Sequence, residues 1–130
     1  MTREEIIKFW IKSSDKDFRT MANLFRTEDY SWALFLGHLV IEKLLKAYYV
    51  KTVDINHPFI HDLLKIAERT DLRLKKEQED FLDLVTTFNL GARYSDYKMK
   101  FYKKCTKKFT EKNIMKIKEF RQWLKNQLKK

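Results

Sequence analysis

Apolar residues recur along this chain with the three- and four-residue spacing of helices rather than the alternation of strands. The first such segment covers about residues 2–25, and the next about 29–52. The apolar stripe of the first contains Ile7, Trp10, Ser14, Phe18, Met21 and Phe25. The second is apolar on almost every side, which is typical of the most buried helix in a small protein.

Shorter periodic segments follow the linker "TVDIN". Pro58 is suited to the first position of a third, short helix, because a residue there needs no N–H, and His57 would then be the cap residue before it. A fourth helix is predicted over about 75–89 and ends near Asn89 and Gly91, residues suited to a helix C-terminus. Its buried residues are Phe81, Val85 and Phe88, and those of the third helix are Ile60, Leu63, Leu64 and Ala67.

The C-terminal part of the chain predicts a fifth helix that opens after Thr110, a reasonable N-cap. Its apolar positions are Ile114, Ile117, Phe120, Leu124 and Leu128. Residues 92–109, between the fourth and fifth helices, are expected to be irregular or only partly helical.

The composition favours an all-α fold in one domain, residues 1–130, because the chain has only two glycines and one proline. A single cysteine, Cys105, excludes an internal disulfide, and the first residues lack the apolar core of a signal peptide, so a cytoplasmic location is expected. The most apolar window, 32–50, is interrupted by His38, Glu42, Lys43 and Lys46 and is therefore a core helix, with no membrane span expected.

The positive charge of the chain gathers at one end. Residues 93–130 contain 14 Lys and Arg against 3 Asp and Glu, a net charge of +11, whereas residues 1–92 are nearly balanced. Such a region suits an anionic partner such as RNA or a nucleotide, and it is equally typical of a solvated lysine-rich helix. The candidate nucleic-acid contacts are Lys98, Lys100, Lys103, Lys104, Lys107 and Lys108.

Three polar residues follow one another at four-residue spacing in the second helix. His38, Glu42 and Lys46 therefore share a face of the least polar helix, where burial is costly without partners. Glu42 either pairs with Lys46 or orients a basic residue from elsewhere, for which Arg93 is the obvious candidate.

The pair His57 and His61 has a spacing that can bind metal on a helix. Asp62 is the only nearby carboxylate suited to help, and capping explains His57, so no metal site and no cofactor are expected. His61 is expected to lie partly buried beside the core.

Three segments in succession resemble the HEPN family, named for nucleotide-binding domains of higher eukaryotes and prokaryotes. They are "HLVIEKLLKAYYV", "HPFIHDLLKIAE" and "FNLGARYSDY". The resemblance implies an up-and-down bundle of four to five helices, a homodimer, and a cleft lined by the polar face of the second helix and by Arg93. Many members are toxin ribonucleases of toxin–antitoxin systems, often encoded beside a minimal nucleotidyltransferase that is their partner.

The ribonuclease motif of the family is an Arg followed, after four to six residues, by His. Counting from Arg93, the corresponding positions are Lys98, Met99 and Lys100, and no other Arg has a His at that spacing. An ordinary lysine is protonated at pH 7 and is a poor general base. The family's adenylylated tyrosine would fall at Lys100, and Tyr97 and Tyr102 are out of register.

The sequence therefore favours a non-catalytic HEPN protein that binds nucleotide or RNA or pairs with a nucleotidyltransferase. The alternative is a divergent metal-independent ribonuclease that uses Arg93 with a lysine in place of the histidine. Arg93 is the expected phosphate contact, unless it neutralises Glu42 or Asp96 inside the bundle. The expected ligand-binding residues are Glu42, Lys46, His61, Arg93, Tyr94, Asp96 and Tyr97, the tyrosines as stacking groups.

Overall fold

The chain folds into helices joined by short connections in the computed structural model, which describes residues 1–93 and 95–130, with side chains in the 95–104 helix from Tyr97 onward. The described part contains no strand, so the predicted all-α class is confirmed. The helices are α1 (Arg3–Arg26), α2 (Tyr30–Thr52), α3 (Leu63–Glu68), α4 (Lys76–Arg93), α5 (Ser95–Lys104) and α6 (Lys107–Lys129).

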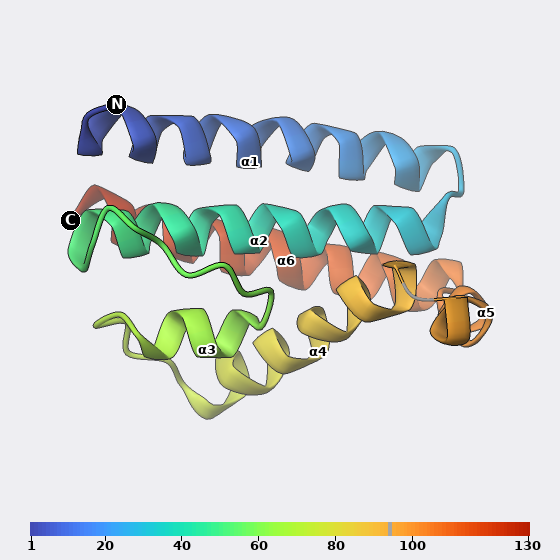
Figure 1. Cartoon of the computed structure of the whole chain (residues 1–130). Coiled ribbons are helices and arrows are strands. Elements are labelled where there is room, and N and C mark those ends of the chain that lie inside the picture. The colour runs from blue at the N-terminus through green and yellow to red at the C-terminus, as the bar shows by residue number, and fades with distance from the viewer. Residues whose placement is uncertain (94) are drawn as a thin grey trace.

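The four long helices alternate in direction and form the expected up-and-down bundle, with α3 in a connection and α5 across one end (Figure 1). Helix α2 lies at the centre, because α1, α4 and α6 all pack against it. Its apolar residues are accordingly buried on nearly all sides, as the sequence predicted. The fully buried side chains of α2 include Leu34, Ile41, Leu44 and Leu45.

Helices α1, α2 and α6 approach one another closely at Gly37, and this fixes the position of α2 along its axis. A Cβ atom on Gly37 would overlap the side chain of Ile117 on α6 and press on Met21 of α1, so the three helices meet here at a residue without a side chain. The buried Ser14 hydroxyl of α1 donates to the Val40 carbonyl of α2 at 2.8 Å. The register of the polar stripe on α2 is thereby set by its neighbours.

The third helix begins later than Pro58, and the prediction for its start is wrong. Residues 53–62 cross the bundle without forming a helix, and α3 begins at Leu63. Asp62 caps it, because its carboxylate accepts a hydrogen bond from the Lys65 N–H at 3.1 Å. His57 is therefore not a cap residue, and its Nδ1 lies 3.2 Å from the carbonyl of Pro58.

Residues 92–109 are more helical than expected. Helix α4 continues past Gly91 to Arg93, and α5 occupies most of the remaining segment. The N-cap of the last helix is Thr106, whose hydroxyl accepts from the Phe109 N–H at 3.2 Å, and Thr110 is a buried residue within α6. The error has a physical cause, since α5 is short and Phe101 is the one buried residue among its described side chains.

None of the helices in the described residues is both long and apolar enough to cross a membrane.

Candidate functional site

The polar stripe on α2 is buried in the bundle. The exposed fraction is 0% for His38, 4% for Glu42 and 6% for Lys46. Charged residues are seldom buried to this degree without a partner. The stripe is therefore the part of the molecule where polar contacts have to be most complete.

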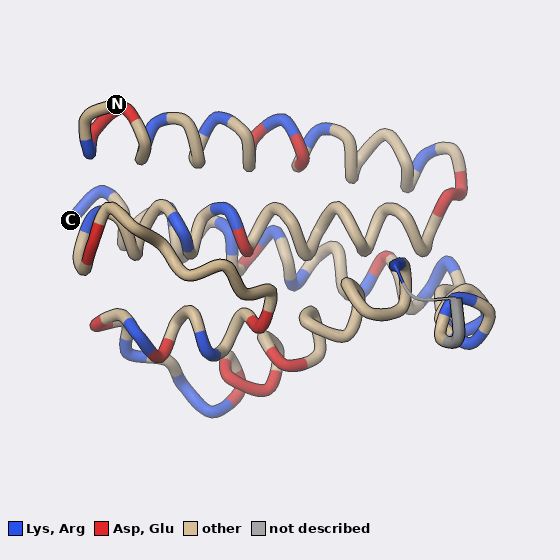
Figure 2. Tube along the Cα trace, viewed as in Figure 1, with Lys and Arg blue, Asp and Glu red and all other residues tan. Residues whose placement is uncertain are grey.

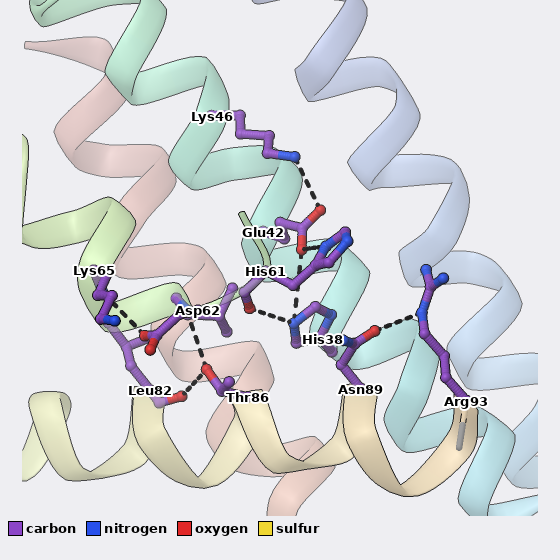
Figure 3. A network of polar contacts seen from close by, with 11 residues as sticks. His38, Glu42, Lys46, His61, Asp62, Lys65, Leu82, Thr86, Asn89 and Arg93 are labelled. Carbon is purple, nitrogen blue, oxygen red and sulfur yellow. Dashed lines mark hydrogen bonds and ion pairs between the residues drawn. The ribbon is translucent and has the colours of Figure 1, made fainter. Parts of the chain in front are cut away.

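The Glu42 carboxylate is the centre of these contacts (Figure 3). One oxygen, Oε1, lies 2.8 Å from Nδ1 of His61 and 3.7 Å from Nε2 of His38. The other, Oε2, accepts from the Lys46 ammonium at 3.2 Å. Burial acts to raise the pKa of Glu42, but the hydrogen bond from His61 and the positive charge of Lys46 oppose it, and the pKa is lowered. Glu42 is a carboxylate at neutral pH.

His38 is neutral at the base of this network. Burial lowers its pKa, although the charge of Glu42 opposes the shift. Its Nε2 lies 3.1 Å from the backbone carbonyl of His61, an acceptor, so this nitrogen carries the ring proton. Its Nδ1 is buried and has no hydrogen-bond partner among the described residues.

The connection before α3 brings His61 to Glu42. Asp62 caps α3, and the Leu63 N–H donates to the Thr86 hydroxyl of α4 at 3.1 Å, which holds the chain beside α2. His61 then directs its carbonyl toward His38 and its ring toward Glu42, while half of its side chain, 50%, stays exposed. The network therefore has one solvent-accessible member.

Arg93, at the end of α4, lies beside this network without an ion pair to Glu42 among the described contacts. Its Nε donates to the Asn89 side-chain oxygen at 2.7 Å, and its guanidinium lies over the ring of Phe35, 5.2 Å from the centroid. The residue is exposed. The basic residue from elsewhere that Glu42 orients is thus His61, whereas the sequence favoured Arg93 for that position.

Arg93 and His61 nevertheless both lie next to the buried ring of His38. The charges of His61 and Arg93 each contribute to the lowered pKa of His38. Figure 3 shows His38 in the middle of the group, with His61 on one side and Asn89 and Arg93 on the other. The structure therefore brings Glu42, Lys46 and His61 into direct contact and places Arg93 at the far side of His38.

Some predicted ligand-binding positions fall outside this arrangement. Tyr94 and the side chain of Asp96 lie outside the described part of the chain, so the alternative pair of Arg93 with Asp96 stays a prediction. Tyr97 is 54% exposed on α5.

The predicted nucleic-acid contacts form an exposed basic surface on α5 and the start of α6. All six lysines are exposed, and Figure 2 shows this end of the molecule rich in Lys and Arg. Of the interleaved aromatics, Phe101 is buried and Phe109 partly buried, whereas Tyr97 and Tyr102 are exposed. Lysines and tyrosines thus share the surface that the sequence predicted for the partner.

A small pocket that sequence reasoning missed opens beside α5. It has a volume of about 240 Å³ and is lined by Ser31, Trp32, Gly91, Ala92, Lys98, Met99 and Tyr102. Trp32 is 49% exposed, and its ring meets that of Phe35 edge-on, with centroids 5.9 Å apart. Arg93 lies over the ring of Phe35, and Phe35 in turn contacts Trp32, which lines the pocket. The Phe35 ring therefore connects the guanidinium to the pocket. An exposed Trp in the first turn of an otherwise buried helix was the available signal.

Larger hollows lie along α6, away from the polar network. One of about 680 Å³ is lined by residues of α4 and α6, including Phe81, Phe120 and Trp123 together with both acidic and basic side chains. Another, of about 640 Å³, follows one face of α6 and includes Lys107 and Lys108. A third, of about 610 Å³, is lined by residues that include Tyr48, Asp71 and Trp123. We favour the smaller pocket as a ligand site because it adjoins Arg93 and combines an indole, a phenol and a lysine.

His57 and His61 do not form a metal-binding pair in this arrangement. The ring of His57 packs against Trp10 at 5.0 Å and Phe59 at 5.2 Å, while His61 turns to Glu42. Within residues 1–93 and 95–130, no three His, Cys, Asp or Glu side chains gather as metal ligands would.

The alternating long helices and the stripe on α2 define an all-α bundle domain with a charged site on its central helix. The family model of the HEPN domain matches residues 7–127, and the chain belongs to the HEPN domain family. The resemblance read from the sequence is confirmed, and membership supports a function related to nucleotides or RNA. Searches among curated proteins and among solved structures found no match.

Proposed function

We propose that this HEPN domain binds nucleotide or single-stranded RNA at the pocket beside α5. The observation that carries the proposal is the contiguity of Arg93, Phe35 and Trp32 with the pocket that Lys98 and Tyr102 also line. A guanidinium suits a phosphate, and an exposed indole or phenol suits the face of an unpaired base. Family membership supports the same class of ligand.

The lysines of α5 and of the start of α6 extend this site along the surface. Their charges attract phosphates without reading base identity, so binding is expected to tolerate changes of sequence and to weaken with salt. The buried Lys46 takes no direct part, because its ammonium pairs with Glu42 and lies over the ring of Trp10, 5.5 Å from the centroid.

Two finer features of the proposal rest on the family alone. The domain forms a homodimer, and it pairs with a minimal nucleotidyltransferase in a system of the toxin–antitoxin type. Exposed apolar side chains, among them Phe9, Phe59 and Leu90, provide surface for such contacts. Light scattering of the purified protein, alone and with a nucleotidyltransferase encoded beside it, measures both associations, and a monomeric mass in each case would contradict them.

No contact among the described residues supports the alternative in which a lysine replaces the catalytic histidine. Lys98 and Lys100 are exposed on α5, and Lys98 lines the pocket next to Tyr102. We therefore assign these lysines to attraction of phosphate.

The test is titration of fluorescently labelled random-sequence single-stranded RNA at several salt concentrations. The wild type is compared with Arg93→Ala, Trp32→Ala and a variant with Lys103, Lys104, Lys107 and Lys108 changed to Gln. We expect each variant to bind more weakly, and the lysine variant to lose about 0.7 of the logarithmic salt slope for each phosphate contact removed.

A matched control removes four exposed cations from α1, by changing Lys8, Lys12, Lys16 and Arg19 to Gln. It lowers the net charge equally, so a purely non-specific attraction would weaken by the same amount in both variants. Equal weakening, or binding that is unchanged in Arg93→Ala and Trp32→Ala, would refute the proposed site.

A further inference from the structure

Two of the hollows along α6 adjoin and form one surface, which we call the α4–α6 groove. The first lies between α4 and α6, and the second lies between the ends of α2 and α6 and the connection that follows α3. Trp123 lines both hollows, so they meet at its indole. The lining residues run from Lys116 along α6 to Lys130, which is about 21 Å at the rise of an α-helix.

The groove exists because α4 and α6 both pack on α2 without closing on each other. Figure 1 shows α4 inclined to α6, and within the described residues the backbones of these two helices stay apart. Side chains bridge the space, since the ring of Phe81 lies 6.3 Å from that of Phe120, which lies 5.4 Å from Trp123. Together with Leu84 they form an apolar floor, and all but Phe120 are only partly buried. The bundle therefore has an open edge of the kind against which a further helix packs.

The shape of the groove favours a convex occupant. The side-chain ridges of one helix fill the grooves of its neighbours, and a bound helix places apolar residues at three- and four-residue spacing over such a floor. A second copy of this chain, related by a two-fold axis through the groove, would present the same hollow and leave the space unfilled. A length of about 21 Å corresponds to a helix of about 14 residues.

One end of the groove is acidic, although the chain as a whole is basic. The charged residues on this part of the rim are three acidic and two basic ones: Glu77, Asp80, Glu119, Lys76 and Lys116. The Lys76 ammonium lies 3.1 Å from the Asp80 carboxylate and compensates it. Residues 77–83 contain four acidic residues and no basic one, and Figure 2 shows acidic residues in the first turns of α4. This end therefore suits basic side chains of a partner.

The other end of the groove is basic. Its charged lining residues are three cations and a single acid: Lys51, Arg73, Lys130 and Asp71. The Asp71 carboxylate already accepts a hydrogen bond from the Tyr48 hydroxyl at 2.5 Å. The Lys51 ammonium donates to the carbonyl of Leu128, which places it beside the end of α6. The two ends thus differ in sign, and an occupant whose charges have the opposite order is favoured.

We propose that the α4–α6 groove binds an amphipathic helix of a partner protein, with acidic residues in its first turn and basic residues in its last turn. The first turn lies at Lys51 and Arg73 and the last at Glu77 and Glu119, so the partner helix runs antiparallel to α6. This order of charges also stabilises the partner helix through its own dipole. The groove shares no lining residue with the pocket beside α5, so the proposal does not depend on binding of RNA there.

The experiment selects peptides on the purified full chain from a displayed library of helices of about 14 residues. Each member has an Ala-rich background in which positions at three- and four-residue spacing vary among Leu, Ile, Phe and Met. Outward positions of the first and last turns vary among Ala, Glu and Lys. We expect enriched peptides to have Glu in the first turn and Lys in the last, and labelled synthetic copies to bind in fluorescence anisotropy.

Two variants locate the binding. Glu77→Lys combined with Glu119→Lys reverses exposed charges at the acidic end, and we expect binding to weaken by about 10-fold or more. Trp123→Ala removes the indole that both hollows share, and we expect a loss of at least about the same size. The matched control, Glu4→Lys combined with Glu111→Lys, makes the same change in net charge at exposed positions outside the groove. It is expected to bind as the wild type does.

An exchange of charges separates recognition by charge from unspecific apolar contact. A peptide with Lys in the first turn and Glu in the last should bind the wild type more weakly than the selected peptide does. The same peptide should bind the variant with Glu77→Lys and Glu119→Lys more tightly than it binds the wild type, because the rim then has the opposite sign. This recovery also shows that the variant is folded.

A library that yields no binder, or binders without an order of charges, would overturn the proposal. Binding that is unchanged in both groove variants would overturn it too, as would equal weakening in the control. Light scattering tests the remaining occupant: a dimeric wild type whose Trp123→Ala variant is monomeric would identify a second copy in the groove and contradict a partner helix. RNA binding is measured separately, so each of these results leaves the proposed function standing.

Discussion

The buried stripe of α2 and the exposed surface of α5 both contain lysine, but in opposite environments. Lys46 is 6% exposed and has a carboxylate at 3.2 Å, whereas lysines such as Lys103 stand in solvent on α5. A buried ammonium is stable only when its charge is compensated, because desolvation costs several kcal/mol. An exposed one remains hydrated and is available to a partner.

This difference separates structure from recognition within one small domain. The charged residues of the stripe on α2 pair with each other. Among the described residues in contact with them, His61 is the one that reaches solvent. The described side chains of α5, those of residues 97–104, include no acidic residue, and Figure 2 shows this segment rich in Lys. Changes in the first region should alter stability, and changes in the second should alter binding.

The largest effect is expected for Glu42→Ala. The change leaves the Lys46 ammonium and the Nδ1 donor of His61 without their acceptor, so we expect a loss of about 3–5 kcal/mol in the free energy of unfolding. Denaturant titration measures it. Glu111→Ala, at an exposed position on α6, is the matched control and should change stability by less than about 0.5 kcal/mol.

A second variant distinguishes the charge from the loss of packing. If the cost arises from an uncompensated ammonium, Lys46→Met combined with Glu42→Ala should recover a substantial part of it. A loss from Glu42→Ala of under about 1 kcal/mol would show that the two regions differ less than their burial suggests.

Much of the fold followed from periodicity, because the helices that carry it are buried on one clear face. Helices α1 and α2 were predicted close to their observed bounds, whereas α4 ends later and α6 begins earlier than predicted. The missed features depend on side chains that act locally: Asp62 and Thr106 are the N-caps of α3 and α6, whereas the sequence had indicated His57, before Pro58, and Thr110. Helix α5 was missed because one buried residue, Phe101, is too weak a signal for periodicity.

The site was predictable in its members and less so in its contacts. Four-residue spacing placed Glu42 and Lys46 on one face, since spacing fixes neighbours within a helix. The partner from another part of the chain, His61, depends on the path of the 53–62 connection, which spacing does not determine. For the same reason the pocket at Trp32 was missed, because α5 is needed to close it.

An effect of intermediate size is expected in the pH dependence of stability, and it arises from the buried stripe on α2. Burial lowers the pKa of His38 in the folded protein below its ordinary value of 6.5, so below pH 6.5 the unfolded chain binds more protons at this residue. Stability should therefore fall as the pH drops from about 6.5, by at most about 1.4 kcal/mol per pH unit for one group. Glu42 adds a loss of the same sign only below pH 4.5, its ordinary value.

The measurement is the free energy of unfolding between pH 7 and pH 5, where Glu42 does not contribute. His38→Gln should be less stable than the wild type at pH 7, since the bond to the His61 carbonyl is altered, and should show a flatter profile. His57→Ala serves as the control, with a slope like that of the wild type. Equal slopes for wild type and His38→Gln would assign the pH dependence to other groups.

The smallest effect on stability is expected where the charge is greatest. Changing Lys103, Lys104, Lys107 and Lys108 to Gln removes no buried contact, because all four side chains are exposed, and it reduces repulsion within a strongly basic surface. The cation over the ring of Phe109 is lost with Lys104, which offsets part of that gain. The free energy of unfolding should therefore change by less than about 0.5 kcal/mol in low salt, and by still less in 1 M salt, where surface charges are screened. Denaturant titration at the two salt concentrations measures both values. A loss above about 1 kcal/mol would mean that these lysines stabilise the fold, and weaker RNA binding by the same variant would then no longer identify a contact surface.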